Sequence, residues 1–373
     1  MKKVLFLIGS LQGGGAEKVL VDTVNSLDRE KYQITVQTLF DCGVHRDKLA
    51  EHVRYRSVVP FKNEWVRRLA GKVLFFLIPV SVTYSLFIRD HYDFEIAFLE
   101  GLPTKVLAKS TNKAAKKIAW IHTDLIRNPA SVRAFGSESA EKAAYDCFDK
   151  VFCVSKSVED AFVEKYGPTA AKADTLYNIL DDAAVIEAAG NIVTLPVTYR
   201  PCFISVGRLT PPKGYDRLLR IHKRLVDEGL MHSLLIIGEG EMREGLEQYI
   251  QENDLQNSVC LMGFQRNPYQ YISKADLFVC SSYAEGFSTV VTEAILCGTP
   301  VVGTDVAGNR EPEEAPRCSV ITENSEEALY EALRRILKDP QILETYRAEL
   351  ISKQAIWEKQ NLIDAFEKAV FFQ

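Results

Sequence analysis

The chain has 373 residues, of which 47% are hydrophobic and 25% are charged, as in soluble globular proteins and unlike disordered ones. This length favours two domains of roughly 150 to 200 residues each. The formal net charge of -5 excludes a general attraction to nucleic acid, because a polyanion would need a local basic patch. We therefore expect no nucleic-acid partner.

The cysteines and the N-terminus indicate a cytoplasmic protein. The eight cysteines are scattered without any C-x-x-C pair, and several lie in apolar runs such as VFCV at 151–154, which is typical of reduced core residues. The beginning, MKKVLFLIGSLQGG, imitates a signal peptide, but its apolar run is short and glycines follow it. We interpret it as a first buried strand.

In the first half, apolar runs of strand length alternate with helical patterns, which predicts a parallel sheet with helices on both faces. The predicted strands are 3–8, 34–40, 53–59, 94–99, 117–121 and 151–154. The periodicity then fades into GNIVTLPVTYRP, residues 190–201, which we interpret as the linker between domains.

The second half repeats this pattern, with a glycine- or serine-containing loop and a helix after each strand. Its predicted strands are 202–206, 234–237, 259–262, 277–280 and 300–302. From about residue 326 the chain is helical, and the amphipathic NLIDAFEKAVFF is expected to pack on the first domain. The predicted fold is α/β, with two Rossmann-like doubly wound domains facing each other across a cleft. They comprise residues 1–195, completed by a helix at 354–373, and residues 196–353.

Ligands of such sheets bind where the strands end, so the loops after strands are the expected site. The loop from Gly9 to Gly15 follows the first predicted strand, and Gly14 and Gly15 precede a helix, beginning near Ala16, whose free amides would attract phosphate. The spacing is not the G-x-G-x-x-G of dinucleotide-binding proteins, so a flexible turn is the alternative.

Loops of the second domain carry further candidates. GRLTPPKGYDRLL places Arg208 and Lys213 before a helix, where two fixed cations suit a diphosphate; the alternative is a merely solvated loop. IIGEGEMREGL supplies Gly238 and Gly240, which would also suit a tight turn.

LMGFQRNPYQYI supplies Gly263 and Phe264, which would contact a flat base, although an aromatic ring is equally plausible as a core residue.

The stretch EGFSTVVTEA follows another strand. Glu285 would stand in the loop, Ser288 would cap the helix, and Glu293 would project from its second turn. Helix-start amides between two carboxylates describe a site for a nucleotide sugar, with one acid for sugar hydroxyls and the other for the ribose. The alternative is a pair of unrelated exposed acids.

Together, GRLTPPKG, EGFSTVVTEA and the paired Rossmann pattern resemble family 4 of the retaining glycosyltransferases, which have the GT-B fold, and GGGAEK is similar to members that build bacterial surface polysaccharides. The resemblance implies an acceptor-binding first domain and a donor-binding second domain. It implies that Glu285 contacts the donor sugar, that Glu293 binds ribose, and that amides near Gly286, Phe287 and Ser288 contact sugar or phosphate.

The resemblance also implies a reaction. Arg208 and Lys213 match the pair that neutralises the diphosphate, which suits the negative charge that a departing nucleoside diphosphate gains. His122, in WIHTD, matches a histidine near the reaction centre, although a lone histidine is more often structural. We expect no metal, because no Asp-x-Asp occurs. We expect front-face attack by the acceptor hydroxyl, with the donor phosphate taking its proton.

One stretch departs from the family pattern. After GTPVVGTDVAG the chain reads NREPEEAPRCSV, where the family often has a glycine pair and an acidic-glycine stretch. The role of the loop near Gly308 is therefore open.

Residues 61–90 combine Lys62, Arg67, Arg68 and Lys72 with Trp65 and a strongly apolar segment. A membrane span is disfavoured, because a lysine and a proline interrupt the run within the sheet pattern. A buried helix explains the apolar residues, whereas the basic, tryptophan-bearing start suits peripheral contact with the inner face of the plasma membrane. With such contact, the acceptor would be lipid-linked, such as a polyprenyl-diphosphate glycan; a soluble acceptor is the alternative.

Other functions fit less well. A sugar-nucleotide epimerase also uses paired Rossmann domains but does not require the two glutamates, and an NAD dehydrogenase would need a different glycine spacing. A non-catalytic GT-B partner subunit would have lost the donor contacts that this chain retains. UDP-sugars are the commonest donors of the resembled family, with GDP-sugars second.

Overall fold

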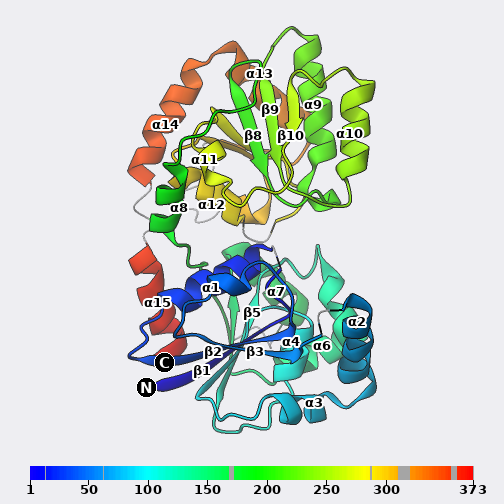
Figure 1. Cartoon of the computed structure of the whole chain (residues 1–373), viewed down its shortest axis with the longest axis vertical. Coiled ribbons are helices and arrows are strands. Elements are labelled where there is room, and N and C mark those ends of the chain that lie inside the picture. Colours follow the sequence, from blue (N-terminus) through cyan, green and yellow to red (C-terminus); the bar gives the residue numbers. More distant parts are fainter. Residues whose placement is uncertain are drawn as a thin grey trace. The chain divides into compact units, whose positions relative to one another are not determined.

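The computed structural model describes residues 1–12, 14–61, 63–167, 172–285, 288–309, 320–353 and 359–372. The chain forms two compact units, the first made of Met1–Leu180 with Gln360–Gln373 and the second of Asp181–Lys359. Each unit is built on one parallel β-sheet with helices packed against it (Figure 1). The prediction of two doubly wound sheets is therefore confirmed.

The first sheet has seven strands in the order β3-β2-β1-β4-β5-β6-β7. They are β1 (Lys2–Ile8), β2 (Tyr32–Phe40), β3 (Arg54–Val59), β4 (Phe94–Ala97), β5 (Lys116–Ile121), β6 (Lys150–Cys153) and β7 (Ala173–Thr175). The central strand β1 is buried on both faces from Val4 to Ile8, because helices cover both sides of a parallel sheet. Sequence periodicity did not indicate β7, a short edge strand without a buried residue.

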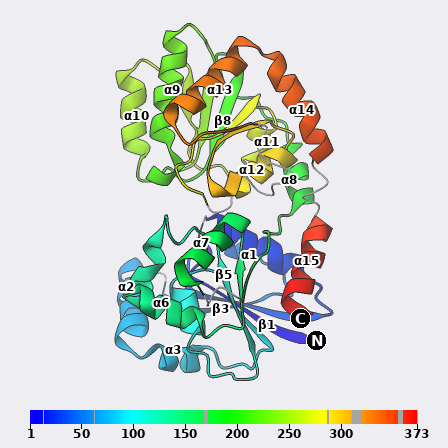
Figure 2. The ribbon, with the colours of Figure 1, turned by 180° about the vertical axis from the view of Figure 1, so that it is seen from behind.

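The helices of the first unit are α1 (Gly15–Ser26), α2 (Glu64–Lys72), α3 (Val80–Phe87), α4 (Leu102–Leu107), α5 (Val132–Phe135), α6 (Glu138–Tyr145), α7 (Lys156–Tyr166) and α15 (Lys359–Phe371), with the short helices η1 (Arg46–Lys48), η2 (Val73–Leu77) and η3 (Pro129–Ser131). The C-terminal helix α15 packs on this unit, beside the first strand (Figure 2). Phe371 stacks on Tyr32 with ring centroids 4.4 Å apart, and Phe366 stacks on Trp120 at 5.4 Å.

The second sheet has six strands in the order β10-β9-β8-β11-β12-β13. They are β8 (Cys202–Val206), β9 (Ser233–Ile237), β10 (Val259–Leu261), β11 (Leu277–Cys280), β12 (Val301–Thr304) and β13 (Val320–Thr322). Its helices are α8 (Asp182–Ala189), α9 (Tyr215–Asp227), α10 (Arg243–Glu252), α11 (Tyr269–Ile272), α12 (Thr289–Leu296), α13 (Glu326–Lys338) and α14 (Gln341–Lys353), with η5 (Pro211–Lys213) and η6 (Ala307–Asn309). The short edge strand β13 was not predicted.

Alternate residues of the strands face the two apolar layers of the second unit. Phe203, Leu234 and Ile236 pack in the layer that contains α9, α10 and α13. Ile204 and Leu235 point to the opposite layer, with α11 and α12. Burial on both faces explains why these strands read as continuous apolar runs in the sequence.

The boundary between the units lies earlier than the predicted one. The chain passes into the second unit after Leu180, so α8 belongs to that unit although it was expected in the first. Asn267 Nδ2 donates to Ala188 O at 2.8 Å, and Ser273 Oγ donates to Ala189 O at 2.9 Å. These long-range bonds hold α8, which local sequence patterns do not reveal.

Candidate functional site

Loops that follow several strands of the second sheet meet at its carboxyl edge. They come after β8, β9, β11 and β12. Main-chain hydrogen bonds join them, from Leu209 N to Glu239 O at 2.9 Å and from Gly308 N to Glu285 O at 3.1 Å. This is the edge at which open α/β sheets bind ligands.

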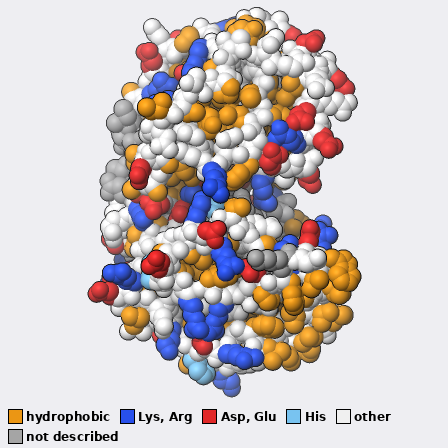
Figure 3. Space-filling view, viewed as in Figure 1, with side chains coloured by type: hydrophobic (Ala, Val, Ile, Leu, Met, Phe, Trp, Pro, Cys, Tyr) orange, Lys and Arg blue, Asp and Glu red, His pale blue; other side chains and the backbone are white. Residues whose placement is uncertain are grey.

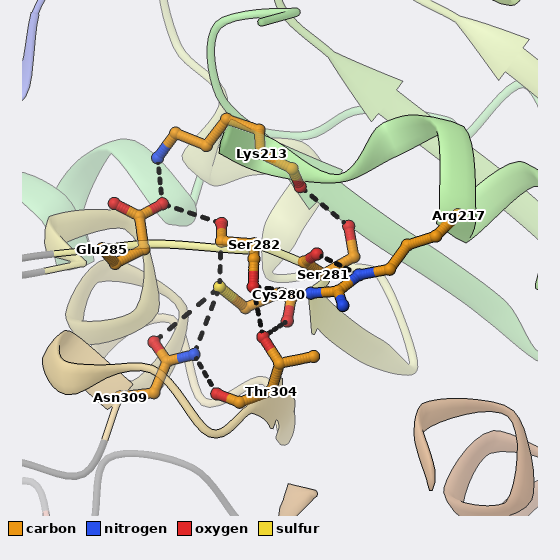
Figure 4. Close-up of polar contacts among 8 residues, drawn as sticks. All are labelled: Lys213, Arg217, Cys280, Ser281, Ser282, Glu285, Thr304 and Asn309. Atoms are coloured by element: carbon orange, nitrogen blue, oxygen red, sulfur yellow. Dashed lines mark hydrogen bonds and ion pairs between the residues drawn. The ribbon is translucent and has the colours of Figure 1, made fainter. Parts of the chain in front are cut away.

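Lys213 and Glu285 form an ion pair at this edge (Figure 4). Lys213 Nζ contacts Glu285 Oε1, and Ser282 Oγ donates to the same oxygen at 2.8 Å. Burial lowers the pKa of Lys213, but the adjacent carboxylate of Glu285 outweighs this effect and the net shift is upward. The ammonium therefore stays charged, next to a carboxylate that can accept hydrogen bonds from hydroxyl groups.

The loop that carries Glu285 is held by a residue that sequence reasoning did not single out. Arg217, on α9, is almost fully buried and donates through Nε to Ser281 O at 2.7 Å and through Nη2 to Ser282 O at 2.6 Å. Its guanidinium also lies 4.1 Å from the ring centroid of Tyr283. A buried arginine with these partners fixes the main chain just before Glu285.

A second set of contacts holds the same loop from the side of β12. Thr304 Oγ1 donates to Ser282 O at 2.6 Å, and Asn309 Nδ2 donates to Thr304 O at 2.9 Å (Figure 4). Asn309 also contacts Cys280 Sγ at 3.4 Å. This network gives a structural role to the segment around Gly308, whose sequence departs from the resembled family.

Neither glutamate is an exposed acid, as the alternative required, and a common role of the two stays a prediction. Glu293 lies in α12 and is only 4% exposed, and Tyr269 Oη donates to its Oε1 at 3.1 Å. The Glu285 side chain is 12% exposed. Two carboxylates are kept out of solvent in proteins only when partners or function require it.

Ser288 stands at the N-cap position of α12, as predicted, but it makes no side-chain capping bond. Its Oγ is buried without a hydrogen-bond partner among the described residues. The predicted position of the serine is thus confirmed, whereas the capping hydrogen bond that it was expected to make is not formed. Gly286 and Phe287, predicted to present amides, lie outside the described residues.

Arg208 and the predicted glycines lie on the neighbouring loops. Arg208 is exposed, and repulsion by its positive charge acts to lower the pKa of Lys213. A Cβ on Gly238 would lie 1.9 Å from Gly207 O, and one on Gly240 would lie 2.4 Å from Leu209 O. Close packing of the two loops therefore requires both glycines, which agrees with the alternative that they serve a tight turn. Their contact with a ligand stays a prediction.

Gly263 and Phe264 follow β10. Gly263 has a φ of +69°, a conformation that favours glycine, and its carbonyl accepts from Gly238 N at 3.0 Å. Phe264 is 60% exposed, which excludes the core position considered from the sequence. An exposed ring beside these loops is free to stack on a planar group.

His122 belongs to the first unit, where it follows β5. Burial lowers its pKa to about 3, although a hydrogen bond with the Phe98 backbone acts in the opposite direction. The ring is therefore neutral, and its Nε2 is buried without a partner among the described residues. Gly14 and Gly15, at the N-terminus of α1, follow β1 in the same unit.

Glu100 was missed by sequence reasoning. It accepts from His122 N at 3.0 Å and from Thr123 Oγ1 at 2.9 Å, so it holds the loop that carries the histidine. Burial raises the pKa of Glu100, and hydrogen bonds to that loop oppose the shift. Nothing local in FLEGLPT distinguishes this glutamate from a surface acid.

Within the part of the chain that the structure describes, no group of three or more His, Cys, Asp or Glu side chains is arranged to hold a metal ion. In the second unit, the structure brings Lys213 into contact with Glu285, with Arg208 on the same loop as Lys213. Glu293 and Ser288 lie on the helix that follows Glu285. His122, Gly14 and Gly15 lie on the other unit.

Comparisons with known proteins agree with this arrangement. A family model described as "Glycosyltransferase Family 4" matches residues 13–184, and one described as "Glycosyl transferases group 1" matches residues 194–355. Among curated proteins, the chain is 30% identical over 218 residues to an N-acetylgalactosamine-N,N'-diacetylbacillosaminyl-diphospho-undecaprenol 4-alpha-N-acetylgalactosaminyltransferase of Campylobacter jejuni, with 58% of each chain covered. It is 26% identical over 228 residues to the O-antigen biosynthesis glycosyltransferase WbnH of Escherichia coli, with 60% of each covered. The chain thus spans less than two thirds of the length of these relatives.

Among solved structures, the chain is similar to Anabaena HepE in complex with UDP. The TM-score is 0.70 at 21% identity, and the match covers 100% of both chains. This likeness shows the fold and confirms the prediction of a GT-B architecture.

Proposed function

Because the chain belongs to the family 4 glycosyltransferases, as the family models show, we propose that it transfers a sugar from a nucleotide-diphosphate sugar to a glycan acceptor, with retention of configuration. The observation that carries this proposal is the half-buried Lys213–Glu285 pair at the carboxyl edge of the second sheet. It offers a fixed cation and a hydroxyl acceptor side by side, which are the two groups that a sugar diphosphate requires.

In the proposed complex, Lys213 and Arg208 bind the diphosphate, and Glu285 accepts hydrogen bonds from hydroxyls of the donor sugar. Glu293 binds the ribose, with Tyr269 holding its carboxylate in place. Amides near Gly286, Phe287 and Ser288 contact sugar or phosphate, Phe264 stacks on the base, and loop amides at Gly238, Gly240 and Gly263 line the nucleotide. Gly14, Gly15 and His122 are the contribution of the first unit, which binds the acceptor.

The reaction follows from where charge develops. As the bond between sugar and diphosphate breaks, negative charge grows on the leaving phosphate. A half-buried, charged Lys213 stabilises this charge more strongly than water would, because its position is fixed in advance. The acceptor hydroxyl attacks on the same face and gives its proton to the departing phosphate. The neutral ring of His122 is suited to hydrogen-bond a sugar hydroxyl.

The donor and acceptor classes are proposed from the relatives. HepE has been solved with UDP and with UDP-glucose, which supports a UDP-sugar donor. The printed name of the Campylobacter jejuni relative includes diphospho-undecaprenol, which supports an acceptor linked to a polyprenyl diphosphate. We place the reaction in the synthesis of surface polysaccharide at the cytoplasmic face of the membrane. A sugar-nucleotide epimerase or a non-catalytic subunit would not require Arg208, Lys213, Glu285 and Glu293 together.

Nucleotide release from a panel of UDP- and GDP-sugars, with and without membrane extract, tests the proposal. We expect release from one UDP-sugar, stimulated by the extract, and a product whose anomeric configuration by NMR matches that of the donor. Lys213→Met should abolish release, while the control Lys223→Met, which removes an ion pair with Asp227 on the surface of α9, should leave it unchanged. Absence of both binding and turnover with every donor would refute the proposal.

A further inference from the structure

A group of large apolar side chains lies exposed on two helices of the first unit. Figure 3 shows it as a continuous hydrophobic area at the lower right, over α2 and α3. Trp65 is 72% exposed and Leu77 is 76% exposed. The α2–α3 patch also contains Leu69, Phe76, Val82 and Leu86. Contiguous apolar surface of this kind usually marks an interaction site.

The inner face of the same segment is firmly attached to the sheet. A Cβ on Gly71 would lie 2.7 Å from the Phe40 ring, so α2 packs closely on β2. Phe75 is buried edge-to-face against Phe40 with centroids 5.7 Å apart, and Tyr84 Oη donates to Glu95 Oε1 at 2.6 Å. The buried-helix explanation therefore accounts for this inner face only. The outer apolar residues are held toward solvent by a well-packed support.

The segment is bent in the middle. The π-helix η2 continues α2, and the chain turns at Pro79 before α3 begins. Thr83 Oγ1 donates to Leu74 O at 2.6 Å and satisfies a carbonyl at the bend. Within the described residues no single helix has the length and composition of a membrane span; only the bent pair Glu64–Leu77 and Val80–Phe87 does, with 119° between its parts.

Several cations lie beside the patch in sequence and structure. Residues 61–90 contain five lysines and arginines against two acids, although the whole chain has a net charge of -5. Arg67, Arg68 and Lys72 lie on α2. From α4, Lys105 Nζ lies 4.8 Å from the Phe76 ring centroid and donates to Phe75 O at 3.2 Å.

The basic character continues past the end of α3. Arg89 and Arg54 border a cavity of about 340 Å³ that Lys3 also lines. Asp90 is the acid of this group, and it pairs with Arg54 at 2.9 Å and with Arg56 at 3.0 Å. On α2, Glu64 pairs with Arg68 at 2.6 Å. Cations therefore outnumber acids both in residues 61–90 and around this cavity.

We propose that the α2–α3 patch docks the protein on an anionic lipid bilayer, with Trp65, Phe76 and Leu77 inserted among the lipids and the cations against the headgroups. An apolar surface edged by lysine and arginine, with an exposed tryptophan, is complementary to the interface of such a bilayer. A second copy of the chain fits less well, because it would bring like charges together. The inference rests on the proposed function, since a polyprenyl-linked acceptor is present only at a membrane.

Vesicle flotation tests the inference. The full chain is mixed with vesicles of phosphatidylcholine alone or of phosphatidylcholine with phosphatidylglycerol. We expect binding to the anionic vesicles only, weakened by added salt. Trp65→Ser with Leu77→Ser, and separately Arg67→Glu with Arg68→Glu, should each lower the affinity on the order of tenfold or more. Ile192→Ser, which alters a fully exposed apolar residue elsewhere, should have no effect.

The outcomes separate this inference from the proposed function. The docking proposal would be overturned if the wild-type protein did not bind anionic vesicles. It would also be overturned if both double-substitution variants bound them as tightly as the wild type. A third contrary result would be a dimer of the wild-type protein, seen by sedimentation without lipid, that becomes a monomer in the variant Trp65→Ser with Leu77→Ser. Hydrolysis of the donor in the absence of acceptor should be unchanged in Trp65→Ser with Leu77→Ser. Absence of any donor binding or turnover by the wild-type protein would refute the transferase proposal, and the vesicle result would not depend on it.

Discussion

Lys213 and Glu285 are charged groups that hold each other in a poorly solvated position. Neither would be stable there alone, because an unpaired buried charge is costly. In the proposed complex, phosphate oxygens of the donor lie near the ammonium and sugar hydroxyls lie near the carboxylate. Under that proposal the two charges are held in place before the donor binds, which is the requirement for electrostatic stabilisation of a transition state.

The two glutamates should respond differently to replacement by glutamine. Glu285→Gln removes the partner charge of Lys213, and we expect kcat for donor turnover to fall by about 10²–10³-fold. Glu293→Gln keeps an oxygen that can accept from Tyr269, so we expect the fold to persist and the donor KM to rise by about tenfold. Steady-state nucleotide release measures both effects. If neither variant differed from the wild type, the assigned roles would be wrong.

Arg217 should act through the position of the loop before Glu285. Arg217→Met removes its bonds to Ser281 and Ser282, and Ser282 O keeps its bond from Thr304. The Ser281 carbonyl loses its arginine donor, at a cost of about 1–3 kcal/mol in the free energy of unfolding. We also expect kcat to fall in the variant molecules that remain folded. Arg217→Lys, which keeps a charge and a donor, should recover part of this kcat.

The matched control is Arg224→Met, on the same helix. Arg224 is half-exposed and pairs with Glu327 on the surface, so its loss should change stability by less than about 1 kcal/mol and leave kcat unaltered. Chemical denaturation and nucleotide release distinguish the two arginines. Equal effects at both positions would contradict a positioning role for Arg217.

At the scale of elements, the turn from η5 into α9 depends on Gly214. Its φ is +66°, and a Cβ there would lie 2.1 Å from Ser281 O, at the end of β11. The same glycine that allows the turn thus allows the loop that carries Lys213 to approach the loop that carries Glu285. A larger residue would separate the two loops.

Gly214→Ala should therefore lower stability more than the same substitution at a glycine that has a similar backbone conformation but no atoms near its Cβ position. Gly229 has a φ of +80° and no atom within 4 Å of its Cβ position, so Gly229→Ala reports the backbone strain alone, about 1–2 kcal/mol. We expect Gly214→Ala to lose more stability than this in thermal unfolding and to lose donor turnover as well. Similar losses for both variants would show that the close approach to Ser281 is unimportant.

The longer elements were predictable because their burial pattern is local. Strands such as β1 and β9 are buried on both faces and read as apolar runs. The edge strands β7 and β13 have few buried residues and left no such run. The unit to which α8 belongs was not predictable, because it is decided by bonds to residues of α11 and its flanks, about eighty residues away in the chain.

At the scale of the whole molecule, buried histidines couple stability to pH. In the second unit, His232 Nδ1 donates to Leu230 O at 2.8 Å, which leaves its Nε2 to accept from His222 Nδ1 at 2.8 Å. Ser258 Oγ then donates to His222 Nε2 at 2.9 Å. Burial lowers the pKa of His222 to about 2 and that of His232 to about 4.

The first unit contributes in the same direction, because burial lowers the pKa of His45 to about 4 and that of His122 to about 3. The unfolded chain takes up protons at these histidines near pH 6.5, whereas the folded chain does so only near pH 4 or below. Stability is therefore complete above about pH 6.5 and is lost as the pH falls from there toward 4. Burial raises the pKa of Glu100, which acts in the opposite direction.

We expect the free energy of unfolding to be lower at pH 5.5 than at pH 7.5, by about 1.4 kcal/mol for each buried histidine, less the opposing effect of Glu100. Urea titrations at the two pH values measure this difference. The control His52→Gln alters an exposed histidine and should leave the difference unchanged. Equal stability at both pH values would contradict the burial of these rings in neutral form.

The sequence alone determined the two parallel sheets, the family and the acids and cations of the loops after the strands of the second sheet, because periodicity, strand-loop-helix order and motif spacing are local properties. Tertiary structure decided what these residues do to one another. It paired Lys213 with Glu285, placed Arg217 against carbonyls more than sixty residues away, buried Glu293 and left Phe264 exposed. Such contacts depend on which strand ends lie side by side, and that order follows from the packing of the whole sheet and not from any single segment.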